Sequence, residues 1–548
     1  MSRYNIGMTT KRATFALIVV FTLVAAYNIY MVPKIGYSAV PTEWSPGIDW
    51  GRYYIVGNGH LISETGSALT WQSNIIDYGA FDVLPKILFA ILNLITGITD
   101  FPRDLELHAL LPWAGIAFIP VLSLLAYRTL GGPKCPKYAL DPYLLLLFSL
   151  FPSVSAVSVV SGNTNGSAIA RALFLLMLLL MVILFSSKNN RKMLMITYFI
   201  LLIAVFYFYH TWAYYLSIIL CCVGCIKGIK KDIDGLSIIF TSVLIFICYS
   251  IYINTNLFNE TFRISKTFIN SIDLLNFISI SNTMKVNPEL FAYQSLSNLF
   301  SQMQFLNSAL IFVISMIFIY IYLQRIKNGV SNSKEQILFW IFCGQIAIGL
   351  FLFVWDGFLG VYARIFEALT YLSILLLAYN LVYSSGYLKK FLHVIVIVIV
   401  GISIYNYVSY PEPMKMHLVE SEWNDISFIG NNVPKEEIIF SDFRIGTPLV
   451  YHGQRNIVTL DSTNNAPGDT EDILYSVYYN PFRPDLILDR ILCSNRYYVM
   501  LSQRQSQVYI LDPCLLQFKC ASTNYIERWD EQINFHKVYC STIQLYLR

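Results

Sequence analysis

The segment from Gly47 to Gly66 gathers charged and aromatic side chains directly after the first long apolar run of the chain. Asp49, Arg52 and His60 lie in it, next to two consecutive tyrosines. A carboxylate near the headgroup level of a membrane can be desolvated enough to act as a general base toward a substrate hydroxyl. Asp49 is therefore the candidate catalytic residue, and Arg52 and His60 are candidate substrate-binding residues. A solvated loop acid or a helix N-cap is an equally open interpretation of Asp49.

Three further candidates follow along the chain. Asp77 and Asp82 flank a Tyr-Gly turn before another apolar stretch, where they could bind substrate or simply cap the helix that follows. His210 lies among aromatic residues in FYFYHTWAYY, at the boundary of a candidate membrane span. It could donate a hydrogen bond to a phosphate, or it could be a histidine satisfied within the membrane interface.

Arg364 falls at the start of an apolar helix, where a deeply placed arginine costs roughly 2.5–3.5 kcal/mol. Such an arginine is normally paired with an acid or bound to an anion. Asp356 or Glu367 could be the acid. A lipid phosphate would also suit the planar guanidinium, which binds phosphate through two hydrogen bonds. Arg171, early in another apolar helix, raises the same question.

These residues belong to a chain of 548 residues, of which 56% are hydrophobic and only 13% are charged. A soluble domain carries roughly a quarter charged residues, so this surface cannot all meet water. Apolar runs of about 18–22 residues predict a mainly α-helical, polytopic protein embedded in a lipid bilayer. The net charge of +4 is too small to indicate nucleic acid as a partner.

Hydropathy predicts roughly eleven membrane spans. They begin near residues 13, 108, 143, 168, 193, 211, 235, 306, 337, 363 and 391. The first apolar run lacks a convincing cleavage site and is expected to remain in place. With the N-terminus in the cytoplasm, every inner connection carries lysine or arginine, as the positive-inside rule requires. The sequence thus predicts a transmembrane bundle of the plasma membrane over residues 1–409, with outer loops at 31–107 and 254–307.

The apolar stretch from Phe81 to Ile98 needs a separate argument. A span at this position would reverse every later loop and place the basic connections outside. We therefore predict an amphipathic or re-entrant helix that lies in the outer interface.

Residues 410–548 are predicted to form a small α/β domain on the extracytoplasmic side. We expect buried strands at 436–441, 456–460 and 497–501, helices near Pro448 and at 486–492, and a closing hairpin at 536–548. The cysteines of this domain could form disulfides in an oxidising compartment, in any of three pairings, or stay reduced. They are Cys493, Cys514, Cys520 and Cys540.

Several short motifs occur in a characteristic order. An early aspartate is followed by tyrosines (Asp49 to Tyr54), then by DVLPKILFAILNLITGI, by FYFYHTW at His210, by YARIFEALTYLSILLLA from Tyr362 and by the closing HKVYCSTIQLYL. In this arrangement the chain resembles the GT-C superfamily of polytopic membrane glycosyltransferases. The resemblance implies transfer of a sugar from a polyprenyl-phosphate or polyprenyl-diphosphate donor on the outer membrane face. The acceptor would be a glycan, a lipid or a protein.

The resemblance also implies roles for individual residues. Asp49 would activate the acceptor, Arg364 would hold the lipid phosphate and His210 would line the donor site. Many members carry a second acid in the first outer loop, whereas Trp50 and Gly51 follow Asp49 here. Whether a divalent cation such as Mg²⁺ or Mn²⁺ takes part therefore stays open. The expected activity is hexosyl or pentosyl transfer. The alternatives are a glycan polymerase or ligase, a transporter and a non-catalytic membrane scaffold.

Overall fold

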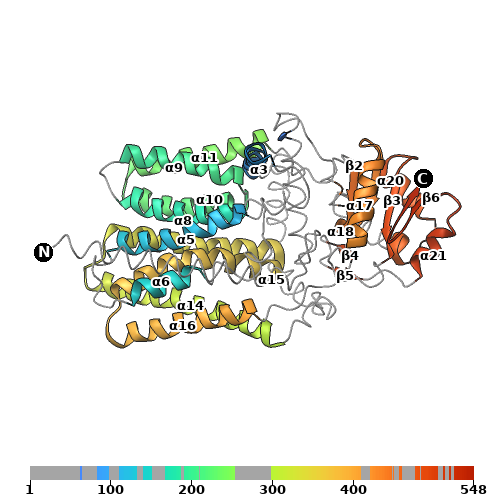
Figure 1. Ribbon diagram of the computed structural model, residues 1–548. Helices are drawn as coiled ribbons and strands as arrows, with labels where there is room; N and C mark the ends of the chain where they lie inside the picture. The colour runs from blue at the N-terminus through green and yellow to red at the C-terminus, as the bar shows by residue number, and fades with distance from the viewer. Residues whose placement is uncertain are drawn as a thin grey trace, which may run out of the picture.

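The computed structural model is mainly helical, with two small sheets near the C-terminus (Figure 1). Among the described residues, all strands follow the last long helix of the bundle. The structure describes residues 62–63, 83–97, 110–131, 140–150, 167–186, 191–208, 210–253, 298–408, 420–446, 449, 456–459, 475–479, 481, 483–503, 510–512, 517–519 and 524–548.

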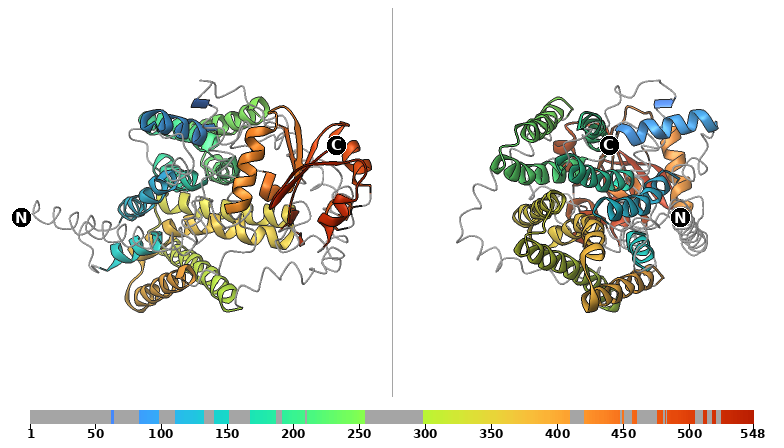
Figure 2. Two further views of the ribbon diagram at one scale, coloured as in Figure 1. Left: turned by 45° about the vertical axis from the view of Figure 1, so that its right-hand side comes forward. Right: turned by 90° about the vertical axis from the view of Figure 1, so that its left-hand side faces the viewer.

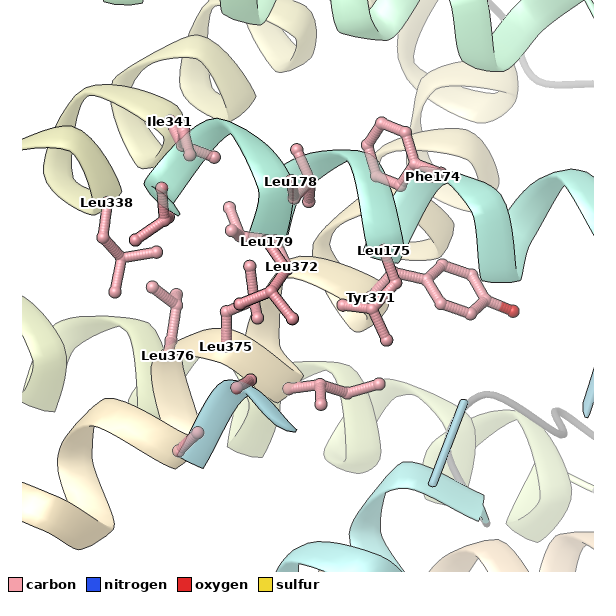
Figure 3. Packing of buried hydrophobic residues seen from close by; sticks show 14 of the residues in the cluster. Phe174, Leu175, Leu178, Leu179, Leu338, Ile341, Tyr371, Leu372, Leu375 and Leu376 are labelled. Atoms are coloured by element: carbon pink, nitrogen blue, oxygen red, sulfur yellow. The ribbon is translucent and has the colours of Figure 1, made fainter. Parts of the chain in front are cut away.

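Long apolar helices pack side by side in a bundle, and successive helices run in opposite directions (Figures 1 and 2). A large cluster of buried apolar side chains holds them together; Figure 3 draws a part of it, in which leucines of α8 interdigitate with those of α15. The helices are α5 (Leu110–Thr129), α6 (Asp141–Leu150), α8 (Ser167–Ser186), α9 (Arg191–Phe208), α10 (His210–Ile229), α11 (Ile233–Ile253), α14 (Asn298–Lys327), α15 (Ser333–Tyr383) and α16 (Gly386–Val408).

A glycine brings α10 and α15 into close contact. A Cβ atom at Gly344 would lie 2.7 Å from the Cα atom of Ile219, so a larger residue would require the backbone to move. Membrane helices lack a hydrophobic drive toward one another and rely on such close packing at small residues. This contact holds α10 against the first half of α15.

The helix α15 turns back on itself. Its 51 residues would extend about 76 Å in a straight line. Yet the hydroxyl of Tyr379, near its end, donates to Glu335 Oε2, near its start, at 3.1 Å. Leu338 and Leu376 likewise lie close together in Figure 3. The chain therefore reverses between these residues and forms two antiparallel arms.

The two arms correspond to the spans predicted near residues 337 and 363. The backbone between the two arms is helical throughout. The helix α14 begins at Asn298, inside the outer loop predicted at 254–307, and its apolar segment begins at Leu306, where the sequence predicts the next span. Asparagine, serine and glutamine in its first turns lower the hydropathy there without interrupting the helix.

Two helical segments are long and apolar enough to cross a bilayer, Leu306–Lys327 and Gly386–Tyr405, with mean hydropathies of 2.2 and 2.0. The other apolar helical segments found among the described residues are shorter. Bulky apolar side chains on both segments face outward, as with Phe312, which is 53% exposed, and Val394, which is 56% exposed. Such a surface is expected where a helix meets lipid tails.

The helix α3 (Val83–Thr96) lies across the bundle (Figures 1 and 2). Figure 1 looks nearly along its axis, whereas the bundle helices are seen lengthwise. Its 14 residues extend about 21 Å, which is too short to span a bilayer core of about 30 Å. A helix at this position that is not a span agrees with the sequence prediction for residues 81–98.

The C-terminal part contains a five-stranded sheet in the order β2-β1-β3-β7-β6. β1 pairs in parallel with β2 and β3, whereas β7 pairs antiparallel with β3 and β6. These strands lie where the sequence predicts buried strands and a closing hairpin. The strands are β1 (Ile438–Ser441), β2 (Asn456–Thr459), β3 (Tyr498–Ser502), β6 (His536–Cys540) and β7 (Ile543–Leu547), with a separate hairpin of β4 (Ile510–Asp512) and β5 (Gln517–Lys519).

Helices cover both faces of this sheet. Ile439 and Met500 belong to the cluster that includes residues of α17, while Phe440 and Val499 belong to the cluster that includes residues of α20 and α21. Burial on both faces explains why the central strands read as continuous apolar runs. The remaining elements are α17 (Glu420–Asn432), α18 (Phe443–Gly446), the π-helical turn η4 (Tyr475–Tyr479), α20 (Pro484–Leu492) and α21 (Tyr525–Asp530).

Candidate functional site

The predicted site residues of the first outer loop all lie outside the described residues. They are Asp49, Arg52, His60, Asp77 and Asp82. The described residues do show how the two ends of the bundle differ.

The lysines and arginines predicted for the inner side meet at one end of the bundle. Lys227, at the end of α10, donates to the carbonyl of Phe185, at the end of α8, at 2.5 Å. Lys334, at the start of α15, donates to the carbonyl of Thr129, at the end of α5, at 2.7 Å. We call this the basic end, defined by Lys227, Arg325, Lys334 and Lys389.

Two buried carboxylates at the basic end are fully engaged with cations. Asp141, which is 1% exposed, lies 2.6 Å from Lys389 Nζ and 2.8 Å from His393 Nε2. Glu335, which is 0% exposed, accepts two hydrogen bonds of 2.9 Å from Arg325. A buried carboxylate is tolerated only with such partners, so these pairs join α6 to α16 and α14 to α15.

The predicted residues His210 and Arg364 lie toward the opposite end, here called the distal end. His210 is the first residue of α10, whose last turn reaches the basic end. The rings of Trp212 and Tyr371 are 5.6 Å apart and bring α10 against the second arm of α15. Arg364 precedes Tyr371 by seven residues, or about two helical turns farther from the basic end.

A third cation approaches the distal end on α8. The rings of Phe174 and Trp212 are 4.7 Å apart, and Arg171 precedes Phe174 by about one helical turn. Side chains on a helix lean toward its N-terminus, which for α8 is the distal end. Arg171, His210 and Arg364 thus come from three neighbouring helices that meet there. Arg171 is the residue for which the sequence raises the same question as for Arg364.

Trp212 carries a buried donor at the distal end. Its side chain is 1% exposed, and the indole Nε1 has no hydrogen-bond acceptor within the part of the chain that the structure describes. A buried donor without an acceptor costs about 1–3 kcal/mol. Tyr371 has its hydroxyl directed away from the leucine cluster in Figure 3. The indole N–H of Trp212 is thus a buried donor that no acceptor of the described residues satisfies.

Sequence reasoning missed Trp212. The aromatic residues around His210 are typical of a membrane-interface belt, whose side chains lie at the surface. Trp212 and Tyr215 are instead buried in the bundle, at 1% and 4% exposure. Only the packing of α8, α10 and α15 separates a buried tryptophan from one that lies at the headgroups.

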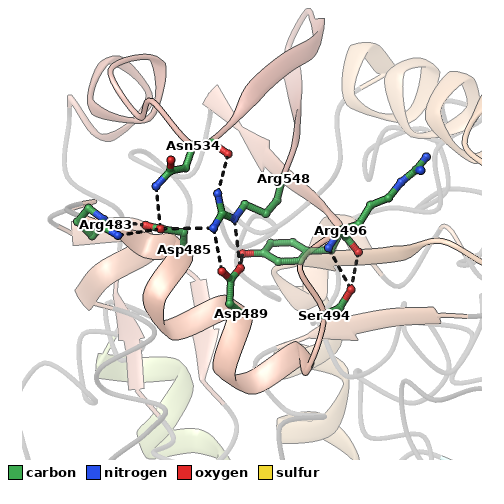
Figure 4. Close-up of polar contacts among 8 residues, drawn as sticks. Arg483, Asp485, Asp489, Ser494, Arg496, Asn534 and Arg548 are labelled. Atoms are coloured by element: carbon green, nitrogen blue, oxygen red, sulfur yellow. Dashed lines mark hydrogen bonds and ion pairs between the residues drawn. The ribbon is translucent and has the colours of Figure 1, made fainter.

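A polar cluster ties the last strand to α20 (Figure 4). Asp485, which is 2% exposed, lies 3.3 Å from Arg483 Nη2 and 2.8 Å from Asn534 Nδ2. Arg548 Nη2 lies 2.9 Å from Asp489 Oδ2. Burial acts to raise the pKa of Asp485, but the hydrogen bonds from Arg483 and Asn534 outweigh it and hold that pKa below its usual value. These contacts hold Arg548, which follows β7, against α20.

The sequence left open whether the cysteines of the C-terminal part form disulfides or stay reduced. Cys493 and Cys540 are exposed free thiols in this structure. Cys514 and Cys520 lie outside the described residues. Within the described ranges, no group of three or more His, Cys, Asp or Glu side chains is placed to hold a metal ion.

Comparison with known proteins places the fold. No protein-family model matches the sequence, and no curated protein matches it either. The structure of the Archaeoglobus fulgidus oligosaccharyltransferase in complex with Zn and sulfate matches with a TM-score of 0.57 at 12% identity, over 90% of this chain and 68% of that chain. The same enzyme, AglB, in complex with an inhibitory peptide and a dolichol-phosphate matches with a TM-score of 0.55 at 12% identity, over 90% and 70%.

ArnT from Cupriavidus metallidurans in the apo state is also similar, with a TM-score of 0.48 at 10% identity, over 96% of this chain and 98% of that chain. The match to the oligosaccharyltransferase spans both the bundle and the C-terminal sheet, because it covers nine-tenths of the chain. The chain therefore shares the fold of the Archaeoglobus fulgidus oligosaccharyltransferase, which agrees with the resemblance that its sequence motifs indicate.

Proposed function

We propose that this chain is a membrane glycosyltransferase. It transfers a hexosyl or pentosyl group from a polyprenyl-phosphate or polyprenyl-diphosphate donor to an acceptor on the outer face of the membrane. The fold shared with an oligosaccharyltransferase supports glycosyl transfer in general. The observation that carries the proposal is the packing of α8, α10 and α15 around Trp212, whose buried indole donor has no acceptor among the described residues. Arg171, His210 and Arg364 belong to these three helices.

In this proposal the lipid phosphate binds at the distal end. Arg364 contributes a bidentate guanidinium, and Trp212 Nε1 donates a further hydrogen bond to a phosphate oxygen. His210 lines the donor site. These donors stabilise the negative charge that grows on the phosphate as it leaves. Cations and an indole N–H suit that task, because a leaving phosphate is an acceptor only.

The transfer step needs one base. The acceptor oxygen attacks the anomeric carbon, the bond from that carbon to the phosphate oxygen breaks, and the lipid phosphate departs with the bonding electrons. Asp49 takes the proton of the acceptor. Arg52, His60, Asp77 and Asp82 contribute to substrate binding from the same outer loop. A divalent cation, Mg²⁺ or Mn²⁺, would bind there through the loop acids and neutralise phosphate charge.

The proposed site faces away from the cytoplasm. The bundle, residues 1–409 with roughly eleven spans, would sit in the plasma membrane with its N-terminus and basic end inside. Residues 410–548 would lie outside as an α/β domain, beyond the distal end. The gathering of basic residues at one end and the exposed apolar faces of α14 and α16 support this orientation.

The first test measures sugar transfer by purified protein in lipid vesicles. Radiolabelled polyprenyl-phosphate hexoses and pentoses are offered as donors, with a membrane extract as acceptor. Asp49→Asn and Arg364→Ala should each lower the transfer rate by about 10²–10³-fold, the scale for loss of one group that acts in the transition state. Arg128→Ala is the matched control, because Arg128 is an exposed arginine near the basic end.

Three outcomes test the proposed activity and the assigned base. Loss of transfer in both site variants, with the control unchanged, supports the proposal. Full transfer by Asp49→Asn contradicts the assigned base and directs attention to Asp77 and Asp82. Absence of transfer by the wild type with every donor contradicts the enzyme and favours the transporter or the scaffold.

The orientation has its own test in the free thiols of the C-terminal part. A membrane-impermeant maleimide applied to intact cells should label Cys493 and Cys540, which are both exposed. Double replacement by serine is the control for labelling elsewhere. Labelling that requires cell lysis would place the domain inside and contradict the proposal.

A further inference from the structure

The helix α3 has its polar residues on the wrong face for a helix in water. Its buried face carries Lys86, which is 3% exposed, and Asn93, which is 1% exposed. Its opposite face exposes Leu94 at 70% and Ile95 at 76%. Lys86 and Asn93 are seven residues apart and so lie on one face of the helix. This inversion is expected for a helix whose outer face meets lipid tails and whose inner face meets a polar group.

The inner face of α3 packs against the bundle near the distal end. Leu84 and Leu88 contact the buried cluster of the bundle. Figures 1 and 2 show α3 crossing the bundle on the side nearer to the C-terminal sheet, close to α9. The face that carries Asn93 is therefore turned toward the protein at the end where the donor is proposed to bind.

Asn93 has a complete amide group without partners. Neither Nδ2 nor Oδ1 forms a hydrogen bond within the described part of the chain, although both atoms are buried. A buried amide needs an acceptor for its N–H groups and a donor for its oxygen. A phosphate at neutral pH offers acceptors only and would leave Oδ1 unsatisfied. Two neighbouring hydroxyl groups of a sugar satisfy both atoms at once.

We propose that Asn93 recognises the sugar of the lipid-linked donor by binding two of its hydroxyl groups through Nδ2 and Oδ1. This inference rests on the proposed function and adds a specificity-determining residue to it. Lys86 places a positive charge about 10 Å away on the same face, toward the start of the helix. The amide is thus the sugar subsite, and the arginines and the indole of the distal end form the phosphate subsite.

The test compares two lipid probes on the full-length protein in nanodiscs. One probe is polyprenyl-phosphate glucose or mannose, each measured separately, and the other is the same polyprenyl phosphate without sugar. Asn93→Leu keeps the size of the side chain but removes both hydrogen-bonding atoms. We expect the affinity for the sugar-bearing probes to fall about tenfold and the affinity for the sugar-free probe to stay unchanged. Thr96→Val, which removes an exposed hydroxyl of the same helix, should change neither.

A second measurement guards against misfolding. Since the buried amide lacks a partner without ligand, Asn93→Leu should leave the melting temperature of the ligand-free protein unchanged or raise it. A lower melting temperature would mean that the amide stabilises the protein itself and would contradict the inference. Equal losses for both probes, or no loss for either, would also overturn it. Wild type that binds neither sugar-bearing nor sugar-free lipid would instead contradict the proposed function.

Discussion

The two ends of the helical bundle differ in whether their buried polar groups have hydrogen-bond partners. At the basic end, Asp141 and Glu335 are almost fully buried, and each contacts cations at 2.6–2.9 Å. At the distal end, Trp212 and Asn93 are equally buried, but the indole N–H and the whole amide have no partner among the described residues. The first pattern is that of a scaffold, and the second is the one on which the proposed ligand site rests.

The difference between the two ends holds for the residues just named and does not extend to every buried polar atom. At the basic end the hydroxyls of Ser331 and Ser384 also lack partners among the described residues, and so does the side-chain oxygen of Asn380, although Asn380 Nδ2 donates to the carbonyl of Ile314 at 2.9 Å. A hydroxyl can turn toward a nearby carbonyl, and it costs little to move. An indole N–H or an amide fixed between packed helices cannot turn in this way. Trp212 and Asn93 differ from Asn380 in that none of their side-chain polar atoms has a hydrogen-bond partner among the described residues.

The largest effect is expected where a charge pair of the basic end is broken. Asp141→Ala leaves Lys389 buried without its carboxylate and should lower the free energy of unfolding by about 3–5 kcal/mol. Denaturant unfolding in detergent micelles measures it. The control is Asp234→Ala, at an exposed carboxylate near the same end. If the two variants were equally stable, the ion pair between Asp141 and Lys389 would not stabilise the bundle.

The opposite behaviour is expected at the distal end. Trp212→Phe removes the unpaired donor and keeps the ring, so the stability of the ligand-free protein should be unchanged or slightly higher. Binding of polyprenyl phosphate should weaken about tenfold, measured in nanodiscs. Trp340→Phe, in the first arm of α15 near the basic end, is the matched control and should not affect binding. Unchanged binding by Trp212→Phe would remove the indole from the phosphate subsite.

The smallest effect is expected in the C-terminal cluster, which pairs its charges as the basic end does. The folded pKa of Asp485 lies below its unfolded value of about 3.9. The stability from its charge is therefore fully present above about pH 4 and is lost as the pH falls through the folded pKa. Asp485→Asn should reduce the difference in melting temperature between pH 7 and pH 3, whereas Glu531→Gln, at an exposed position, should not. If Asp485→Asn showed the same difference in melting temperature as the wild type, the charge of Asp485 would not stabilise the C-terminal cluster.

Several parts of the fold could be predicted because each depends on local sequence. The alternating directions of the bundle helices follow from apolar length and from lysines such as Lys227 and Lys334, which gather at one end as expected. The strands around Phe440 and Val499 follow from short apolar runs bounded by turns. The assignment of residues 81–98 to a helix other than a span followed from charge balance, before its faces were known.

The candidate site was predicted less completely. His210 and Arg364 were singled out because charge is rare next to apolar helices, and their helices do meet. Trp212 and Asn93 were not, because an indole among aromatic residues or an asparagine in a leucine-rich helix is ordinary in sequence. The continuous helical backbone through the turn of α15 was also not predicted.

The sequence by itself determined which segments prefer lipid, which way they run and where a sheet can form. These properties depend on how each side chain interacts with water or with lipid. Only the tertiary structure decided which buried polar atoms find partners and which do not. The partner of Asp141 is 248 residues away, at Lys389, whereas Asn93 has none within the described chain. Hydrogen bonds require approach within about 3 Å, which depends on how distant helices pack.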